Sequence, residues 1–198
     1  MVLCVTGPMA SGKNQVSSIL EKMGFAAIDA DVVGHSAVEA EKQKILEAFS
    51  EDAKKAGISL LDENGKIIRR NLGALIFGNP EMVKTQESIV YPYITSHLKS
   101  FVESNIAEGK NVVINATVLF KTDAMKFVDR ILYVDCPSLK RFFRARKRDG
   151  MKTGQILARF RAQKNLYKNY EATGIKIMKV QNTGSISSLK KSLELLLN

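Results

Sequence analysis

The sequence predicts an α/β fold in which helices flank a doubly wound parallel sheet of about five strands. Short and nearly all-apolar runs at residues 2–6, 111–115 and 130–134 have the composition of parallel strands that are covered on both faces. Further runs at residues 25–28 and 176–180 complete the five strands. Helical patterns separate these runs, and strands that alternate with helices favour a parallel sheet.

The composition favours one compact unit. The 198 residues are 45% hydrophobic, which suffices for one sizeable core with an inserted or appended lobe. The N-terminus lacks a positive region followed by a long apolar stretch, and no run has the length that a bilayer requires. We therefore expect a cytoplasmic protein without a membrane partner. Cys4 and Cys136 lack the spacing of a metal site or a disulfide scaffold, so we expect two buried thiols without a chemical role.

Residues 7–14, Gly-Pro-Met-Ala-Ser-Gly-Lys-Asn, join the first predicted strand to a helical pattern. A loop at a helix N-terminus offers unpaired backbone N–H groups and the positive end of the helix dipole, and both attract anions. The two glycines let the main chain approach a phosphate, while Lys13 would reach the β- and γ-phosphates. We therefore expect nucleotide binding and phosphate chemistry at Gly7, Ala10, Ser11, Gly12, Lys13, Asn14 and Gln15.

The loop follows the phosphate-binding pattern G-x-x-x-x-G-K-[ST] at every position but the last, where Asn14 replaces Ser or Thr. The hydroxyl at that position normally holds Mg²⁺. An Asn amide oxygen is a possible but bulkier ligand for a hard cation. Together with the predicted sheet, the loop indicates a fold of the P-loop NTPase type.

Asp29 and Asp31 follow the second predicted strand, at the edge where open α/β sheets bind ligands. Because the chain is turning there, both carboxylates can reach the cleft. Asp31 is then a candidate general base for a substrate hydroxyl, and Asp29 a candidate to bind a metal or orient a neighbour. The alternative is a helix N-cap, because a helical pattern begins at Val32.

The middle of the chain has helical patterns and no strand pattern, so we expect a helical substrate lobe at about 56–107. The core then comprises about 1–55 and 108–198. The helical patterns lie at residues 32 to about 56, at a short segment that ends at 75–80, and at 82–107 with an interruption at Tyr91–Pro92.

Basic residues crowd positions 140–148, and the net charge of +10 implies acidic partners. Such a run is usually a solvated helix face. In a fold with a phosphate loop, however, arginines on a hinged flap can close over a nucleotide and neutralise charge on the transferring phosphoryl group. We therefore expect a basic lid at about 144–165, which includes part of a helix at about 153–170. Arg144 joins Lys13 and Asp31 as a catalytic candidate.

Nearly the whole chain resembles the dephospho-CoA kinases. Residues 6–14 are similar to that family's loop T-G-G-I-G-S-G-K-S, and residues 28–31 repeat its I-D-A-D strand end. The lobe segments G-x-L-D-R-R-x-L and V-F-x-D-P resemble residues 65–72 and 76–80. The family's H-P-x-I resembles residues 91–94.

The likeness continues in the second half of the chain. Residues 115–121 are similar to the family's D-V-P-L-L-F-E, and residues 144–150 to its R-x-x-x-R-D-G. Arg159 and Gln163 match its R-x-x-x-Q, and residues 182–184 its N-x-G turn on the adenine side. The loop is common to many kinases and ATPases, whereas its combination with I-D-A-D and the order of the segments is specific.

The resemblance implies transfer of the γ-phosphoryl group of ATP, with Mg²⁺, to the ribose 3′-hydroxyl of dephospho-CoA, the last step of CoA biosynthesis. It assigns Asp31 as the base near that hydroxyl, and Asn14 and Asp31 as residues at the metal. It adds Arg148 and Asn182 to the nucleotide site. The substrate contacts that it implies are Asp29, Asp31, Arg69, Tyr91, Arg159 and Gln163.

Five positions depart from the family pattern. Asn14 replaces Ser, Asn115 replaces an Asp near the metal, Ile68 replaces Asp, Tyr91 replaces His and Lys121 replaces Glu. The first two replacements change groups that would help to hold Mg²⁺. Either phosphate oxygens and water hold the ion, or the protein is a weakened relative.

Two other functions are compatible with the sequence. A P-loop kinase for another small acceptor, such as a nucleoside monophosphate, would share the loop, sheet and lid. A regulatory or nucleic-acid-binding relative would need a basic stripe outside the cleft and steeply salt-dependent binding. Aromatic residues are not interleaved with the lid arginines in a base-stacking pattern, apart from Phe142, Phe143 and Phe160, which fit a packed face. We therefore expect no nucleic-acid partner. We also expect a monomer or small homo-oligomer.

Overall fold

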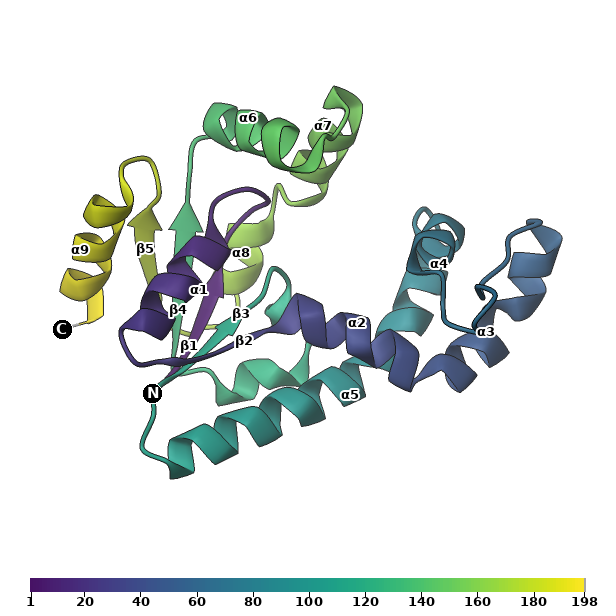
Figure 1. Ribbon diagram of the computed structural model, residues 1–198, viewed down its shortest axis with the longest axis horizontal. Helices are drawn as coiled ribbons and strands as arrows, with labels where there is room; N and C mark the ends of the chain where they lie inside the picture. Colours follow the sequence, from purple (N-terminus) through teal and green to yellow (C-terminus); the bar gives the residue numbers. More distant parts are fainter. Residues whose placement is uncertain (198) are drawn as a thin grey trace. The chain divides into compact units, whose positions relative to one another are not determined.

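The computed structural model describes residues 1–197 (of Asp149, the main chain), and the chain divides into two compact units (Figure 1). The first unit comprises Met1–Ala30 and the segment from Leu98 to the C-terminus. The second unit is Asp31–His97.

As the sequence predicted, the first unit contains a parallel sheet of five strands. The strand order is β2-β3-β1-β4-β5. In the register, Asn115 lies opposite both Val5 and Asp29. The chain therefore brings the ends of β1, β2 and β3 together at one edge of the sheet. The strands are β1 (Val2–Thr6), β2 (Ala26–Asp29), β3 (Val112–Asn115), β4 (Arg130–Asp135) and β5 (Ile177–Gln181).

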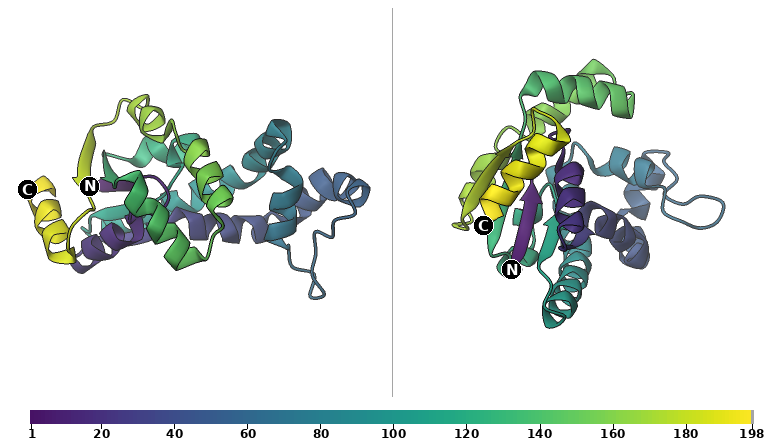
Figure 2. Two further views of the ribbon diagram at one scale, coloured as in Figure 1. Left: turned by 90° about the horizontal axis from the view of Figure 1, so that it is seen from above. Right: turned by 60° about the vertical axis from the view of Figure 1, so that its left-hand side comes forward.

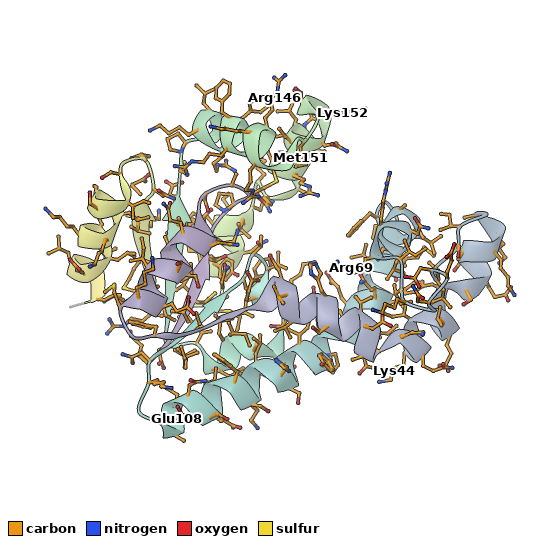
Figure 3. All side chains as sticks on the ribbon, viewed as in Figure 1. Lys44, Arg69, Glu108, Arg146, Met151 and Lys152 are labelled. Carbon is orange, nitrogen blue, oxygen red and sulfur yellow. The ribbon has the colours of Figure 1, made fainter. Side chains whose placement is uncertain are left out.

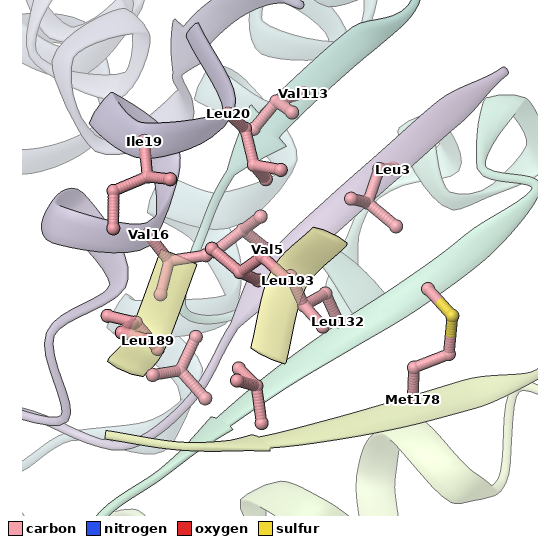
Figure 4. Packing of buried hydrophobic residues seen from close by; sticks show 12 residues of the cluster. Leu3, Val5, Val16, Ile19, Leu20, Val113, Leu132, Met178, Leu189 and Leu193 are labelled. Carbon is pink, nitrogen blue, oxygen red and sulfur yellow. The ribbon is translucent and has the colours of Figure 1, made fainter. Parts of the chain in front are cut away.

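One face of the sheet packs against α1 (Lys13–Lys22) and α9 (Ile186–Leu197) (Figure 4). Alternate residues of each strand face this layer, as the two-residue period of a strand requires. The helices contribute residues at helical spacing, such as Val16 and Leu20 in α1 and Leu189 and Leu193 in α9. Because Leu20 and Leu193 are fully buried, this layer fixes α1, and with it the loop that precedes α1.

The other face carries a buried polar contact around Tyr170 in α8 (Leu166–Glu171). The phenol accepts the N–H of Leu119 at 3.0 Å and donates to the carbonyl oxygen of Thr117 at 3.3 Å, while the Cys4 thiol lies 4.0 Å from it. Leu119 begins the short helix η1 (Leu119–Lys121), and η2 (Asp123–Phe127) follows. Cys4 and Cys136 are both buried and free, as expected.

The lid predicted at about 144–165 covers the second half of α6 (Ser138–Asp149) and all of α7 (Thr153–Ala162). These two helices lie side by side (Figure 2). Gly150 ends α6 in the left-handed conformation, with φ of 60°, a common helix terminus. The prediction of one helix over 153–170 was wrong, because the chain turns at Gln163 and begins α8 only at Leu166. The turn leaves the Gln163 side chain near the phosphate loop.

The second unit is helical, as predicted for most of this segment, and its helices pack through apolar faces. The expected single helix over 32–56 is two helices that meet at Glu41, because residues 39–44 offer little apolar surface to continue a buried face. The helices are α2 (Ala30–Ala40), α3 (Lys42–Lys55), α4 (Arg69–Ile76) and the start of α5 (Pro80–Ala107).

Helix α5 runs without interruption through Pro92, so the predicted break at Tyr91–Pro92 was wrong. A proline in a helix interior removes one backbone hydrogen bond and costs roughly 3 kcal/mol. Val90, Ile94 and Leu98 recur every four residues and are all buried, and this apolar face offsets the cost. Within residues 1–197, no helix combines the length and apolar character needed to cross a membrane.

Candidate active site

The loop between β1 and α1 is a tight turn whose glycines are required by sterics. Gly7 and Gly12 have φ of 150° and 101°, and the Ser11 N–H bonds to the Pro8 carbonyl oxygen at 3.1 Å. A Cβ on Gly7 would collide with the carbonyl oxygen of Val134 in β4. The main chain thus passes β4 at a distance that only glycine permits.

The first turn of α1 has the features of an anion site. Gly12 is the N-cap, and within the described residues no side chain caps the helix, so its first N–H groups face outward. The Lys13 ammonium donates to the Gly7 carbonyl oxygen at 3.1 Å and so lies along the loop. The Ser11 hydroxyl is fully buried and has no hydrogen-bond partner among the described residues, which is unusual for a buried polar group.

Ala10 has φ of 61° and is the non-glycine residue with a left-handed backbone in this loop. That conformation costs roughly 1–2 kcal/mol for a residue with a Cβ. Strain of this kind persists where the surroundings fix the backbone, and it concentrates at functional sites. Here the contacts of the lid and of Asn182 fix the loop.

The lid helix α6 is bonded to the loop through Arg144. Its guanidinium group donates to the Ser11 carbonyl oxygen at 3.3 Å and to the Asn182 carbonyl oxygen at 3.1 Å. It also lies 3.4 Å from the Cys136 sulfur. Arg144 therefore joins the phosphate loop, the end of β4 and the turn after β5.

Asn182 lies in that turn and is 2% exposed. Its amide donates to the Ser11 carbonyl oxygen at 2.9 Å and to the Gln15 side-chain oxygen at 3.1 Å. A Cβ on Gly12 would collide with this amide. The predicted nucleotide residues Ser11, Gly12, Gln15 and Asn182 are thus brought together.

Arg159 and Gln163 contact the loop at Met9. The Met9 N–H donates to the Gln163 side-chain oxygen at 2.7 Å, and the Arg159 guanidinium lies 3.9 Å from the Met9 sulfur. The family resemblance implies that both residues contact the substrate. Met9 itself packs with Ala145 and Ile156, so it anchors the lid pair to the loop.

Arg141 also contacts the loop, although the sequence alone did not distinguish it from the other basic residues of α6. Its guanidinium donates to the Cys136 carbonyl oxygen at 3.0 Å and to the Met9 carbonyl oxygen at 3.5 Å, and lies 4.3 Å from the Phe160 ring centroid. Burial lowers the pKa of this guanidinium from its ordinary value. Its spacing of three residues from Arg144 places both on one helix face, and this signal could have identified it.

A pocket of about 550 Å³ lies between the loop and the lid. Its volume is within the usual range for small-molecule sites. The predicted residues Ala10, Gly12, Gln15, Arg144 and Arg148 line it together with Lys147. The pocket therefore combines the loop backbone with three cationic side chains from α6.

Beside the loop, three side chains from β2, β3 and α1 meet. The Asn115 amide nitrogen donates to Asn14 Oδ1 at 3.1 Å and to Asp29 Oδ2 at 3.0 Å. Asn115 is 4% exposed, and its own Oδ1 has no hydrogen-bond partner within residues 1–197. The cluster therefore contains one carboxylate and two amides.

Asp31, Arg69 and Tyr91 belong to the second unit. Asp31 lies in the first turn of α2, two residues beyond Asp29, and Arg69 is the exposed first residue of α4 (Figure 3). Burial raises the pKa of the Tyr91 hydroxyl above its ordinary value, and the neighbouring Glu87 raises it further. His35, in the same unit, is exposed.

Comparisons with known proteins agree with this geometry. The family model described as dephospho-CoA kinase matches residues 1–187. A dephospho-CoA kinase of Treponema denticola is 34% identical over 195 residues, which cover 98% of this chain and 87% of that protein. One of Carboxydothermus hydrogenoformans is 32% identical over 200 residues, with 97% and 90% covered.

A solved Thermus thermophilus structure superposes with a TM-score of 0.80 at 26% identity, covering 100% of this chain and 96% of that one. The dephospho-CoA kinase structure from Campylobacter jejuni has a TM-score of 0.65 at 22% identity, with 99% and 95% covered, and supports the fold. The match of the family model over almost the whole sequence decides the relationship. The chain belongs to the dephospho-CoA kinase family.

Proposed function

We propose that this protein transfers the γ-phosphoryl group of ATP to the ribose 3′-hydroxyl of dephospho-CoA, giving coenzyme A and ADP. The observation that carries the proposal is the loop of residues 7–14, with its outward N–H groups, the Lys13 ammonium and the unpartnered Ser11 hydroxyl, in a chain of this family. Each of these groups donates to an anion. A polyphosphate would offer acceptor oxygens to all of them.

The loop and lid would do most of the work by positioning and by charge. In phosphoryl transfer the protein takes little part in covalent chemistry. Most of the rate enhancement comes from preorganised hydrogen-bond donors and charges that stabilise the transition state. Lys13 and the loop N–H groups bind the β- and γ-phosphates. Arg144 holds the loop in shape, and Arg148, on the pocket wall, is placed for the nucleotide.

Asp31 is the proposed general base. It takes the proton from the 3′-hydroxyl as the hydroxyl oxygen attacks the γ-phosphorus and the bond to the bridging oxygen of ADP breaks. Support comes from its place in the chain, two residues after Asp29, whose carboxylate is fixed by Asn115 at the sheet edge. The second unit, with Arg69 and Tyr91, is proposed to receive the acceptor.

The cluster of Asn14, Asp29 and Asn115 suits Mg²⁺ in its donor types, because carboxylate and amide oxygens are the ligands that hard cations prefer. The unpartnered Asn115 Oδ1 is a further oxygen available at this edge. When bound, Mg²⁺ neutralises charge on the phosphates. We propose Asn14 and Asp29 as its protein neighbours, with Asp31 close by in the chain.

The test is an acceptor panel. Purified protein is incubated with ATP, Mg²⁺ and, separately, dephospho-CoA, AMP or CMP, and the products are separated by chromatography. We expect phosphorylation of dephospho-CoA at a rate far above that of either monophosphate. Preferred phosphorylation of a monophosphate, or binding of ATP without any transfer, would refute the proposal. The reaction uses soluble small molecules, which fits the proposed location in the cytoplasm.

A further inference from the structure

One amide group joins three elements at the sheet edge. Asn115, the last residue of β3, donates both of its amide hydrogen bonds to oxygens, Asn14 Oδ1 of α1 at 3.1 Å and Asp29 Oδ2 of β2 at 3.0 Å. Asn115 is almost fully buried. The amide N–H₂ group therefore donates to an oxygen on each side.

A divalent cation could also hold the Asn14 and Asp29 oxygens together, because oxygen ligands converge on a metal ion as they converge here on an N–H₂ group. The other half of the amide, Oδ1, has no partner among the described residues. A buried acceptor without a partner is unfavourable, so the present orientation is held by the two bonds that the nitrogen makes. The bridge thus occupies the position between Asn14 and Asp29.

We propose that Asn115 is a positioning residue that holds Asn14 and Asp29 together in place of a metal ion, so that the free protein binds divalent cations weakly and takes them up with nucleotide. This inference rests on the proposed function for the nucleotide. The charge supports it, since the cluster contributes a single carboxylate, whereas Mg²⁺ gives up its water reluctantly and relies on phosphates and carboxylates. The phosphates of the nucleotide supply the missing negative charge.

The substitution Asn115→Asp reverses this arrangement. It removes the bridging donor and places a second carboxylate beside Asp29, so the two repel each other without a metal. With a metal, the same pair becomes a stronger cation site. The variant should therefore gain what the natural sequence lacks, cation binding without nucleotide.

The experiment measures Mn²⁺ binding by electron paramagnetic resonance and melting temperature in EDTA or in Mg²⁺, each with and without ADP. The proteins are the natural chain, Asn115→Asp, and Asn169→Asp as a matched control on the exposed side of α8. We expect the natural chain and the control to bind Mn²⁺ well only with ADP. Asn115→Asp should bind Mn²⁺ alone at least about tenfold more tightly, and its melting temperature should fall by roughly 5–10 °C in EDTA and recover with Mg²⁺.

Tight Mn²⁺ binding by the natural chain without ADP would overturn the inference, and this measurement stands even if Asn115→Asp fails to fold. An Asn115→Asp protein with unchanged metal affinity and melting temperature would also overturn it. No arm uses dephospho-CoA. A failure of the acceptor panel therefore leaves these results intact, and the two proposals fail separately.

Discussion

Arg144 of α6 donates a hydrogen bond to the main-chain oxygen of Ser11 at 3.3 Å, which bonds the lid to the phosphate loop. The same guanidinium group donates to the Asn182 carbonyl oxygen at 3.1 Å. A planar group with several donors can hold two carbonyls at fixed separation, which a lysine ammonium does less well. Arg144 therefore sets the shape of the loop as well as its charge.

Replacement of Arg144 tests this clamp. Arg144→Lys keeps the positive charge but loses the planar guanidinium group that donates to two carbonyl oxygens. We expect ADP affinity and the rate of phosphoryl transfer to fall by about 10- to 100-fold, since each hydrogen bond from a charged group is worth roughly 1.5–3 kcal/mol. Arg146→Ala, an exposed change on the same helix (Figure 3), controls for lost positive charge. Calorimetry and steady-state kinetics provide the readouts. Near-natural affinity and rate in Arg144→Lys would show that charge alone matters and would contradict this role of the guanidinium group.

Lys13→Ala removes the ammonium that lies along the loop. We expect phosphoryl transfer to fall by about 10³-fold, because this charge is placed to stabilise the transferring phosphoryl group. Lys22→Ala, an exposed change in the last turn of the same helix, should leave the rate near normal. Single-turnover measurements compare the two. A Lys13→Ala enzyme with nearly full activity would mean that the loop has another role.

Substitutions at Gly12 and Gly24 can distinguish the cost of backbone strain from the cost of a steric clash. Gly12 and Gly24 have φ of 101° and 95°, yet a Cβ at Gly12 would strike the Asn182 amide, whereas one at Gly24 would meet no described atom within 4 Å. Gly24→Ala should cost about 1–2 kcal/mol of unfolding free energy and leave ADP binding intact. Gly12→Ala should cost more and abolish ADP binding. Urea unfolding measures the free energy of unfolding, and calorimetry measures ADP binding. Equal losses of stability and of ADP affinity in the two variants would contradict a steric clash at Gly12.

Because the Cys4 thiol is buried, we expect the folded protein to lose stability at alkaline pH. Burial raises the pKa of Cys4 from its ordinary 9.0 to about 12, so the folded state holds the proton that the unfolded state releases first. Stability should be full below pH 9.0 and should decline between pH 9.0 and about 12, by up to about 1.4 kcal/mol per pH unit from this group. Burial raises the pKa of Tyr170 as well, which steepens the decline at the alkaline end.

Urea unfolding of Cys4→Ala over the same pH range checks the effect. The variant should be less stable near neutrality because it loses buried volume, but its stability should decline less steeply above pH 9.0. Val5→Ala, its buried neighbour in β1, loses volume without losing a titrating group and should keep the natural slope. If the free energy of unfolding declined with pH equally steeply in the natural chain and in Cys4→Ala, the raised pKa of Cys4 would be refuted as the cause.

The parts of the structure that the sequence predicted depend on local patterns. The five strands appear within one residue of the expected bounds because buried parallel strands are continuous apolar runs. The phosphate loop was predictable because its glycines meet a backbone requirement, such as the close passage of Gly7 past Val134. The position of Asp29 at the ligand-binding edge of the sheet was predictable because this residue follows directly after an apolar run.

The parts that the sequence did not predict depend on tertiary contacts. Arg141 is one basic residue among several in α6, and only the packing of Met9 and Phe160 selects it. Pro92 signals a helix break, but the buried face of α5 overrides that local preference. The orientation of the Asn115 amide follows from its two acceptors, Asn14 and Asp29, which are distant in the sequence.

The most direct test of the central claim is the rate and the site of phosphorylation in the natural chain and in Asp31→Asn. Phosphorus NMR of the product formed from ATP and dephospho-CoA should show one new phosphate on the ribose 3′-oxygen. Asp31→Asn should lower kcat by about 10²- to 10⁴-fold with little change in ADP affinity, whereas Asp123→Asn, on the exposed surface, should not. Phosphate at another position, or a normal rate in Asp31→Asn, would contradict the account.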